Sequence, residues 1–169
     1  KSGNIFNELL KGNYICGQSV ILKRENVKDI KFDEQLKYLN DYKFMVELAR
    51  RYEFYFIQEP LAMYRIHGKN STLSNKDEWL KDQIVINEYF LQQYASIMTK
   101  DVKNIILLRL SALCLRAGEK IRAKRYIYDA VRCNPCSTSN ILYLINFITY
   151  DNKFINNFLK SSYNKYKGI

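Results

Sequence analysis

Two groups of polar side chains in the first half of the sequence could bind a polar ligand and move a proton. The first is acidic and aromatic: residues 32–36 (FDEQL), followed by Asn40-Asp41-Tyr42. The second is the basic stretch Tyr64-Arg65-Ile66-His67. A carboxylate at the start of a helix, beside a strand that ends in Arg and His, could act as a general base. Structural roles are the alternative: a helix cap for the carboxylate, an ion pair for the arginine and a solvated position for the histidine.

A helix and three extended segments are predicted to position these side chains. Asp41 has the residue type of an N-cap, and it precedes apolar residues at helical spacing: Met45, Leu48, Ala49 and Tyr52. Residues 19–22 (SVIL) and 54–57 (FYFI) have the apolar and β-branched character of short strands. Residues 61–67 follow Pro60 and predict an extended stretch, and residues 68–71 (GKNS) predict a loop.

The second half of the chain has helical patterns throughout. A long helix is predicted from about Lys76 to Tyr94. Residues 104–137 fit one tetratricopeptide-type repeat of 34 residues, with Gly118 at the turn between its helices and Pro135 after the second; an ordinary helical hairpin is the alternative. Two more helices are expected, one over residues 140–149 and an amphipathic one around residues 154–159. Within the repeat, Ala123 and Ala130 are the small residues that are expected to let its two helices pack closely.

The composition fits a helix-rich globular protein. Of 169 residues, 47% are hydrophobic and 14% aromatic, which excludes a disordered chain, and only 2 are Pro and 6 Gly, which argues against a turn-rich β-sandwich. We therefore predict a predominantly α (α+β) fold with a few short strands. Its expected parts are residues 1–74, carrying the polar groups, and a helical extension over residues 75–169.

The order of the polar motifs resembles the C-terminal half of family 2 glycosyltransferases, which have the GT-A fold. The resemblance covers about residues 4–72, and the motifs follow one another with similar gaps. They are Asn13, Ser19-Val20, Phe32-Asp33-Glu34-x-Leu36, Asn40-Asp41-Tyr42, Glu59-Pro60-Leu61 and Tyr64-Arg65-x-His67.

This resemblance implies a role for individual residues in an inverting sugar transfer. Asp41 matches the base that takes the proton from the acceptor hydroxyl, and Asn40 stands where the family has Glu. His67 matches the residue near the donor diphosphate and its metal, where Arg65 would support it. The acceptor side would include Gln18, Ser19, Asn40 and Tyr42.

The implied substrates are a nucleotide-diphosphate sugar and a glycan or lipid-linked acceptor, in the synthesis of surface polysaccharide. The intact enzyme is expected to use a divalent metal, Mg²⁺ or Mn²⁺. The sequence has no DxD metal motif and no donor-binding strand–helix series. We therefore expect these 169 residues to be the acceptor-side portion of a longer enzyme, inactive and without cofactor on their own.

The positive charge is concentrated in the second half. Residues 1–99 carry 14 basic and 13 acidic side chains, whereas residues 100–169 carry 13 and 4, which gives +9 of the net +10. Three roles are open for these basic side chains: an ordinary solvated helix face, a surface that binds an anionic membrane, or a nucleic-acid site. The nucleic-acid site ranks last because no motif supports it. A non-enzymatic helical adaptor that binds protein or membrane is the alternative function. The basic residues are Lys120, Arg122, Lys124, Arg125 and Arg132.

The cysteines indicate a cytoplasmic protein, and the basic second half, with the lipid-linked acceptor that the resemblance implies, adds the expectation that it is peripheral at the inner face of the membrane. Four cysteines are too few for a disulfide scaffold, and no apolar run is long enough to cross a bilayer. Cys133 and Cys136 have the CxxC spacing of a zinc or redox site, but they fall where a helix is expected to end and lack further ligands nearby. We interpret them as structural thiols.

Overall fold

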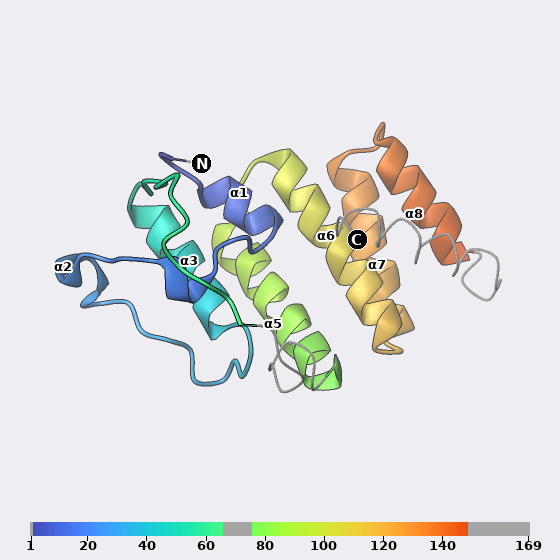
Figure 1. Ribbon diagram of the computed structural model, residues 1–169. Helices are drawn as coiled ribbons and strands as arrows, with labels where there is room; N and C mark the ends of the chain where they lie inside the picture. Colours follow the sequence, from blue (N-terminus) through green and yellow to red (C-terminus); the bar gives the residue numbers. More distant parts are fainter. Residues whose placement is uncertain (1, 66–75, 149–169) are drawn as a thin grey trace.

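The computed structural model describes residues 2–65 and 76–148, and this part of the chain is all-α with essentially no strands. The helices follow one another across the molecule, from α2 at one end to α8 at the other (Figure 1). The predominantly α fold predicted from the sequence is confirmed. The elements are α1 (Phe6–Lys11), the 3₁₀ turn η1 (Gly17–Ser19), α2 (Arg24–Val27), α3 (Asn40–Arg51), α5 (Lys76–Tyr94), α6 (Lys100–Arg116), α7 (Lys120–Cys133) and α8 (Thr138–Ile148).

The α6–α7 hairpin is built on one glycine and two alanines, as the repeat pattern predicts. Gly118 has a φ of +80°, a conformation that glycine adopts without a steric penalty, and it turns the chain between the helices. Ala123 and Ala130 are fully buried, so α7 packs closely on α6, and the hydroxyl of Ser111 donates to the carbonyl of Ala123 at 3.0 Å. α7 ends at Cys133, two residues before Pro135.

One continuous core joins the two halves of the chain. α1 contacts both α3 and α6, and α5 packs along α6, so helices from both sides of residue 74 surround the same interior. Most of the buried side chains belong to one cluster that runs from Ile5 to Ala123, with Leu9, Val46 and Phe90 among its fully buried members, and Leu107, Leu108 and Ala130 form a smaller second cluster. The expected division into two parts at residue 74 remains a prediction, and the structure adds that the parts share a core.

Polar side chains connect the helices within this core. The guanidinium of Arg109 on α6 donates to the carbonyls of Leu10 and Lys11 at the end of α1, and to the side chain of Asn87 on α5. It thereby satisfies carbonyls that the C-terminus of a helix leaves without intrahelical partners. Tyr42 on α3 donates its hydroxyl to the carbonyl of Leu9 at 2.6 Å.

A second connection joins α3 to α5 through a carboxylate. Tyr89 and Tyr94 donate their hydroxyls to Glu47 Oε1, at 2.6 Å and 2.5 Å. Burial and the adjacent Glu47 carboxylate raise the pKa of both phenols, because ionisation would place two negative charges side by side.

The predicted strands at residues 19–22 and 54–57 are wrong. Among the described residues the only strand-like pairing is one isolated bridge, in which Gly3 and Phe54 exchange backbone hydrogen bonds of 2.7 Å and 2.9 Å. Ser19 instead belongs to the turn η1. Apolar alternation indicates an extended backbone, but a strand also needs a neighbour along its length, and the described residues supply this neighbour only at Gly3.

α3 begins earlier than predicted, because Leu39 rather than Asp41 precedes its first turn. Leu39 is buried, and its carbonyl accepts the first helical hydrogen bond, from the Lys43 N–H at 3.0 Å. Asn40 and Asp41 lie inside the first turn, where their side chains accept from the N–H groups of Asp41 and Tyr42. The side chains therefore still cover N–H groups that the helix start leaves without partners.

His67, the loop at residues 68–71 and the amphipathic helix around residues 154–159 lie outside the described residues. The helix predicted over Lys76–Tyr94 has the observed bounds of α5, and the one predicted over residues 140–149 corresponds to α8.

Candidate functional site

Asp41 is the acidic residue at the first turn of α3, where the helix dipole favours a negative charge. Its Oδ1 accepts a hydrogen bond of 2.6 Å from the backbone N–H of Tyr42, which fixes the orientation of the carboxylate. Among the described residues no hydrogen bond to Oδ2 is present. One oxygen is thus held by the helix, and the other is open to accept a proton.

The turn η1 lies directly in front of this carboxylate. A Cβ placed on Gly17 would stand 3.7 Å from Asp41 Oδ2, so the absence of a side chain at Gly17 leaves space beside the acid. Gln18 and Ser19 follow in the same turn and are exposed. The hydroxyl of Ser19 donates to the carbonyl of Cys16 at 2.7 Å, which closes the turn on itself.

Gln18 connects this turn to the extended segment that carries Arg65. Its side-chain amide donates to the carbonyl of Met63 at 3.0 Å, across 45 residues of sequence. Arg65 is exposed two residues further along. The turn that carries the predicted residues Gln18 and Ser19 therefore lies beside the first turn of α3 and is bonded to the segment that carries Arg65.

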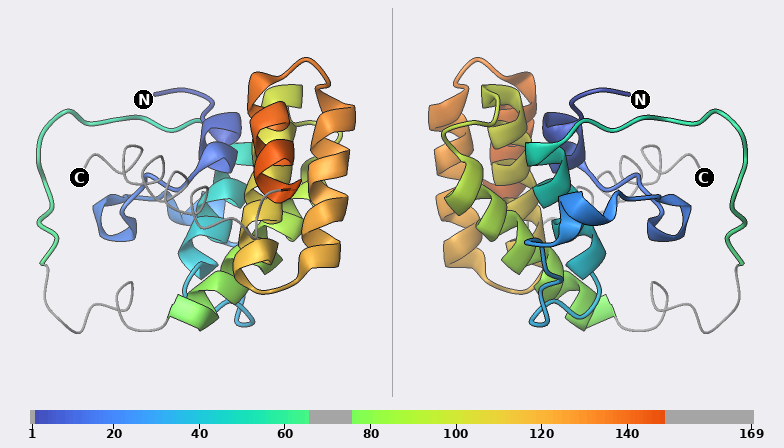
Figure 2. Two further views of the ribbon diagram at one scale, coloured as in Figure 1. Left: turned by 90° about the vertical axis from the view of Figure 1, so that its right-hand side faces the viewer. Right: turned by 90° about the vertical axis from the view of Figure 1, so that its left-hand side faces the viewer.

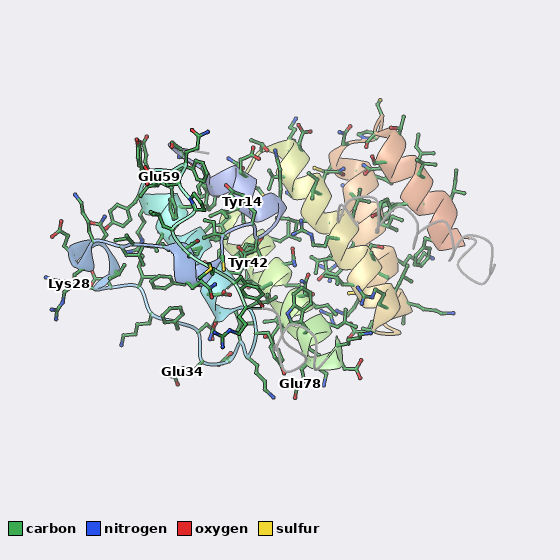
Figure 3. All side chains as sticks on the ribbon, viewed as in Figure 1. Tyr14, Lys28, Glu34, Tyr42, Glu59 and Glu78 are labelled. Carbon is green, nitrogen blue, oxygen red and sulfur yellow. The ribbon has the colours of Figure 1, made fainter. Side chains whose placement is uncertain are left out.

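Tyr42 departs from its predicted place on the acceptor side. Its ring lies in the interior (Figure 3), only 5% exposed, with its edge against Phe90 and its hydroxyl bonded to the carbonyl of Leu9. Burial raises its pKa to about 12. Because both ring and hydroxyl are occupied by the core, Tyr42 stabilises α3 and has no surface for an acceptor. Asn40 is half-buried, and its side-chain oxygen accepts from the N–H of Asp41.

Gly17 was missed by the sequence analysis, which singled out its neighbours Gln18 and Ser19. A signal was present: Gly17 sits between Cys16 and Gln18, and a glycine in a short polar segment often marks a close approach. Only the fold shows that the group approached is the Asp41 carboxylate, 24 positions away in the sequence.

The described residues do not supply a metal site. No group of three or more His, Cys, Asp or Glu side chains in residues 2–65 and 76–148 could hold a metal ion. Cys133 is the last residue of α7, as predicted, and all four cysteines are free thiols. The expected Mg²⁺ or Mn²⁺ therefore has no ligand set in this part of the chain.

The basic residues of the second half have two different environments. Arg122 forms ion pairs with Glu88 on α5 and with Glu119, so it belongs to an internal connection. Tyr126 donates its hydroxyl to the same Glu88. Lys124 and Arg125 point to solvent without an ion pair to any described residue. The charge that remains available thus lies on the outer side of α7.

Comparisons with known proteins do not assign a family. No family model, curated protein or solved structure matches this chain. No helix in the described part of the chain is long and apolar enough to cross a membrane.

Proposed function

We propose that this chain is the acceptor-side portion of an inverting glycosyltransferase, which transfers a sugar from a nucleotide-diphosphate sugar to a glycan or lipid-linked acceptor. Two contacts of the turn η1 carry the proposal: Gly17 lies beside Asp41 Oδ2, and Gln18 donates to the Met63 carbonyl in the segment that also carries Arg65. The turn η1 thereby links two motifs that are far apart in the sequence, the first turn of α3 and the segment with Arg65. Surface polysaccharide assembly is the process that the motif order suggests.

Asp41 would act as the general base. As the acceptor oxygen bonds to the anomeric carbon, the bond from that carbon to the diphosphate breaks, and the diphosphate leaves with the bonding electrons. The acceptor hydroxyl has a pKa far above neutral, so its proton must pass to a base during the transfer. Oδ2 is the atom that would receive it, because Oδ1 is already bonded to the Tyr42 N–H.

The open space at Gly17 would admit the acceptor hydroxyl, and Gln18 would keep the turn in place through Met63. Ser19 and Asn40 would lie on the acceptor side of the proposed active site. Arg65, and His67 by resemblance, would face the donor diphosphate. The described residues contain no ligand set for the expected ion.

Exposed apolar side chains support the idea that a further region covers this face. Ile21, Tyr55 and Met63 are 88%, 86% and 96% exposed, and the segment that carries Tyr55 and Met63 runs away from the helical body (Figure 2). Large apolar surface on extended segments commonly marks an interface. A donor-binding region, placed over these segments, would bury them and complete the active site.

A transfer assay with the full-length protein tests this proposal. Purified protein is incubated with membranes as acceptor and with each of a panel of uridine, guanosine and thymidine diphosphate sugars, and release of the nucleoside diphosphate is measured. We expect Asp41→Asn to lower the transfer rate by roughly 10²-fold or more, the usual contribution of a general base. The control Asp101→Asn makes the same chemical change in the first turn of α6 and should leave the rate unchanged.

Two results would contradict the proposal. One is full activity of Asp41→Asn with its circular dichroism spectrum unchanged. The other is no acceptor-dependent release from any sugar donor by the wild-type protein. The second result would favour the alternative, a helical adaptor without enzymatic activity, which the solvent-facing basic side of α7 supports.

A further inference from the structure

One face of α7 contacts no other helix among residues 2–65 and 76–148. Ala123, Ile127 and Ala130 are buried on the inner side of α7, which packs against α6. The opposite side consists of exposed residues at positions i, i+3, i+4, i+7 and i+11, which share one helical face. These residues, named here the α7 outer face, are Ile121, Lys124, Arg125, Tyr128 and Arg132.

The α7 outer face is positively charged and does not neutralise itself. None of its three cations forms an ion pair with a described residue. The guanidinium of Arg132 lies 5.7 Å from the centre of the Tyr128 ring instead. Asp129 is the one carboxylate within the same stretch of α7, half-buried at the edge of the face. An anionic partner is therefore the electrostatic complement of this surface.

The same face exposes apolar groups that water solvates poorly. Ile121 is 89% exposed and Tyr128 61%, two turns apart on one side of the helix. A basic helix face that also presents an aliphatic and an aromatic side chain is typical of helices that lie in the membrane interface. A nucleic acid would use the charges and the tyrosine ring, but a fully exposed isoleucine adds nothing to base stacking.

We propose that the α7 outer face docks peripherally on anionic lipid. Lys124, Arg125 and Arg132 bind the phosphate and carboxylate groups of the lipid headgroups, while Ile121 and Tyr128 enter the boundary between headgroups and acyl chains. The long cationic side chains can keep their charges at headgroup level while their stems lie against the apolar layer. This docking is independent of the proposed sugar transfer.

Vesicle co-sedimentation of the full-length protein tests the docking. The probes are 100 nm vesicles of phosphatidylcholine alone and of phosphatidylcholine with about 30% phosphatidylserine. We expect binding to the anionic vesicles only, weakening as salt is raised because the attraction is screened. Each surface cation contributes about a fivefold gain in partitioning, so Lys124→Gln/Arg125→Gln/Arg132→Gln should lower it on the order of 100-fold.

A matched variant removes the same charge elsewhere. Lys23→Gln/Arg24→Gln/Lys28→Gln changes three exposed cations at α2. Lys28 lies at the opposite end of the molecule from α7 (Figure 3). This control should retain most of the binding. Ile121→Ser/Tyr128→Ser, which keeps every charge, should weaken binding by roughly tenfold and leave its salt dependence unchanged.

Three outcomes would overturn the proposal. The first is equal binding by the wild-type protein and the α7 triple variant. The second is an equal loss in both triple variants, which would mean that net charge alone drives the attraction. The third is binding to single-stranded RNA without binding to anionic vesicles, which would assign the face to nucleic acid. Circular dichroism and the melting temperature confirm that each variant is folded.

Discussion

A pair of buried amides connects α8 to the α6–α7 hairpin, and its removal should be costly. The side chains of Asn104 on α6 and Asn140 on α8 exchange two hydrogen bonds of 2.9 Å each. The Asn140 amide nitrogen also lies within hydrogen-bonding distance of the carbonyls of Ala130 and Asn134, at 2.8 Å and 2.7 Å, so its two N–H groups are shared among three acceptors. Asn140 is fully buried and Asn104 is 7% exposed, so water does not readily replace a lost partner.

The effect of Asn140→Ala follows from which partners keep another hydrogen bond. The carbonyl of Ala130 also accepts from the Asn134 N–H, and the carbonyl of Asn134 from the Ser137 N–H, so both stay satisfied. Asn104 loses its partner on the oxygen and on the nitrogen. Each buried polar group left unsatisfied costs about 1–3 kcal/mol, so the two groups of Asn104 together predict a loss of about 2–6 kcal/mol in the free energy of unfolding.

Urea unfolding followed by circular dichroism measures this loss, as a fall of about 1–3 M in the midpoint. The control is Asn104→Leu/Asn140→Leu, which replaces both amides by apolar groups of similar size and leaves no unsatisfied side chain. Its loss should be smaller than that of Asn140→Ala alone, although it removes more polar atoms. A midpoint for Asn140→Ala within 0.2 M of wild type, or a larger loss in the double leucine variant, would refute this reasoning.

Two pH-dependent predictions follow from the ionisable groups. Burial raises the pKa of Tyr42 from 10.0 to about 12, so the unfolded chain ionises first and the free energy of unfolding should fall by about 2 kcal/mol as the pH rises from 10 to 12. Tyr42→Phe should reduce this fall, which urea midpoints across that pH range measure. The hydrogen bond from Lys43 lowers the pKa of Asp33 below 3.8, so the stabilisation by this ion pair is present above that pH and is lost as the pH falls through the lowered pKa. Asp33→Asn should therefore lower the melting temperature at pH 7, by an amount that shrinks toward zero in acid. A difference in melting temperature that stays constant with pH would contradict this assignment.

The helical part of the fold was predictable because its signals are local. Helical spacing of apolar residues places α5 at its observed bounds, and a glycine with positive φ marks the α6–α7 turn at Gly118. The extended segments were less predictable, since a strand depends on its neighbour. Phe54 pairs with Gly3 alone, and nothing in residues 54–57 records how long the pairing continues.

The sequence predicted which stretches contribute to the candidate site better than it predicted which way each side chain points. Asp41, Gln18 and Arg65 do lie in stretches that meet, but Tyr42 turns inward. The helical spacing contains this information, because Tyr42 precedes Met45 by three positions and so shares the buried face of α3. A motif identifies which residues occur together, whereas the helical period decides which of them reach solvent.

Folding divides the basic side chains into those that connect helices and those that stay exposed on one surface. Arg109 donates to carbonyls at the end of α1, and Arg122 forms an ion pair with Glu88, so these cations connect α1, α5, α6 and α7. Several of these contacts join residues far apart in the sequence, since Asn87 is 22 positions from Arg109 and Glu88 is 34 positions from Arg122, and no local pattern records them.

Lys124, Arg125 and Arg132 on α7 are exposed to solvent, and the packed helices fix their position relative to Asp41. α3 contacts α1, α1 contacts α6, and α6 contacts α7, without a described break in packing between the two surfaces. A lipid bilayer bound to the α7 outer face would therefore hold the Asp41 carboxylate at a set distance from the membrane. Such an arrangement suits an acceptor that is itself anchored in lipid, because binding the protein to the surface confines enzyme and acceptor to the same layer.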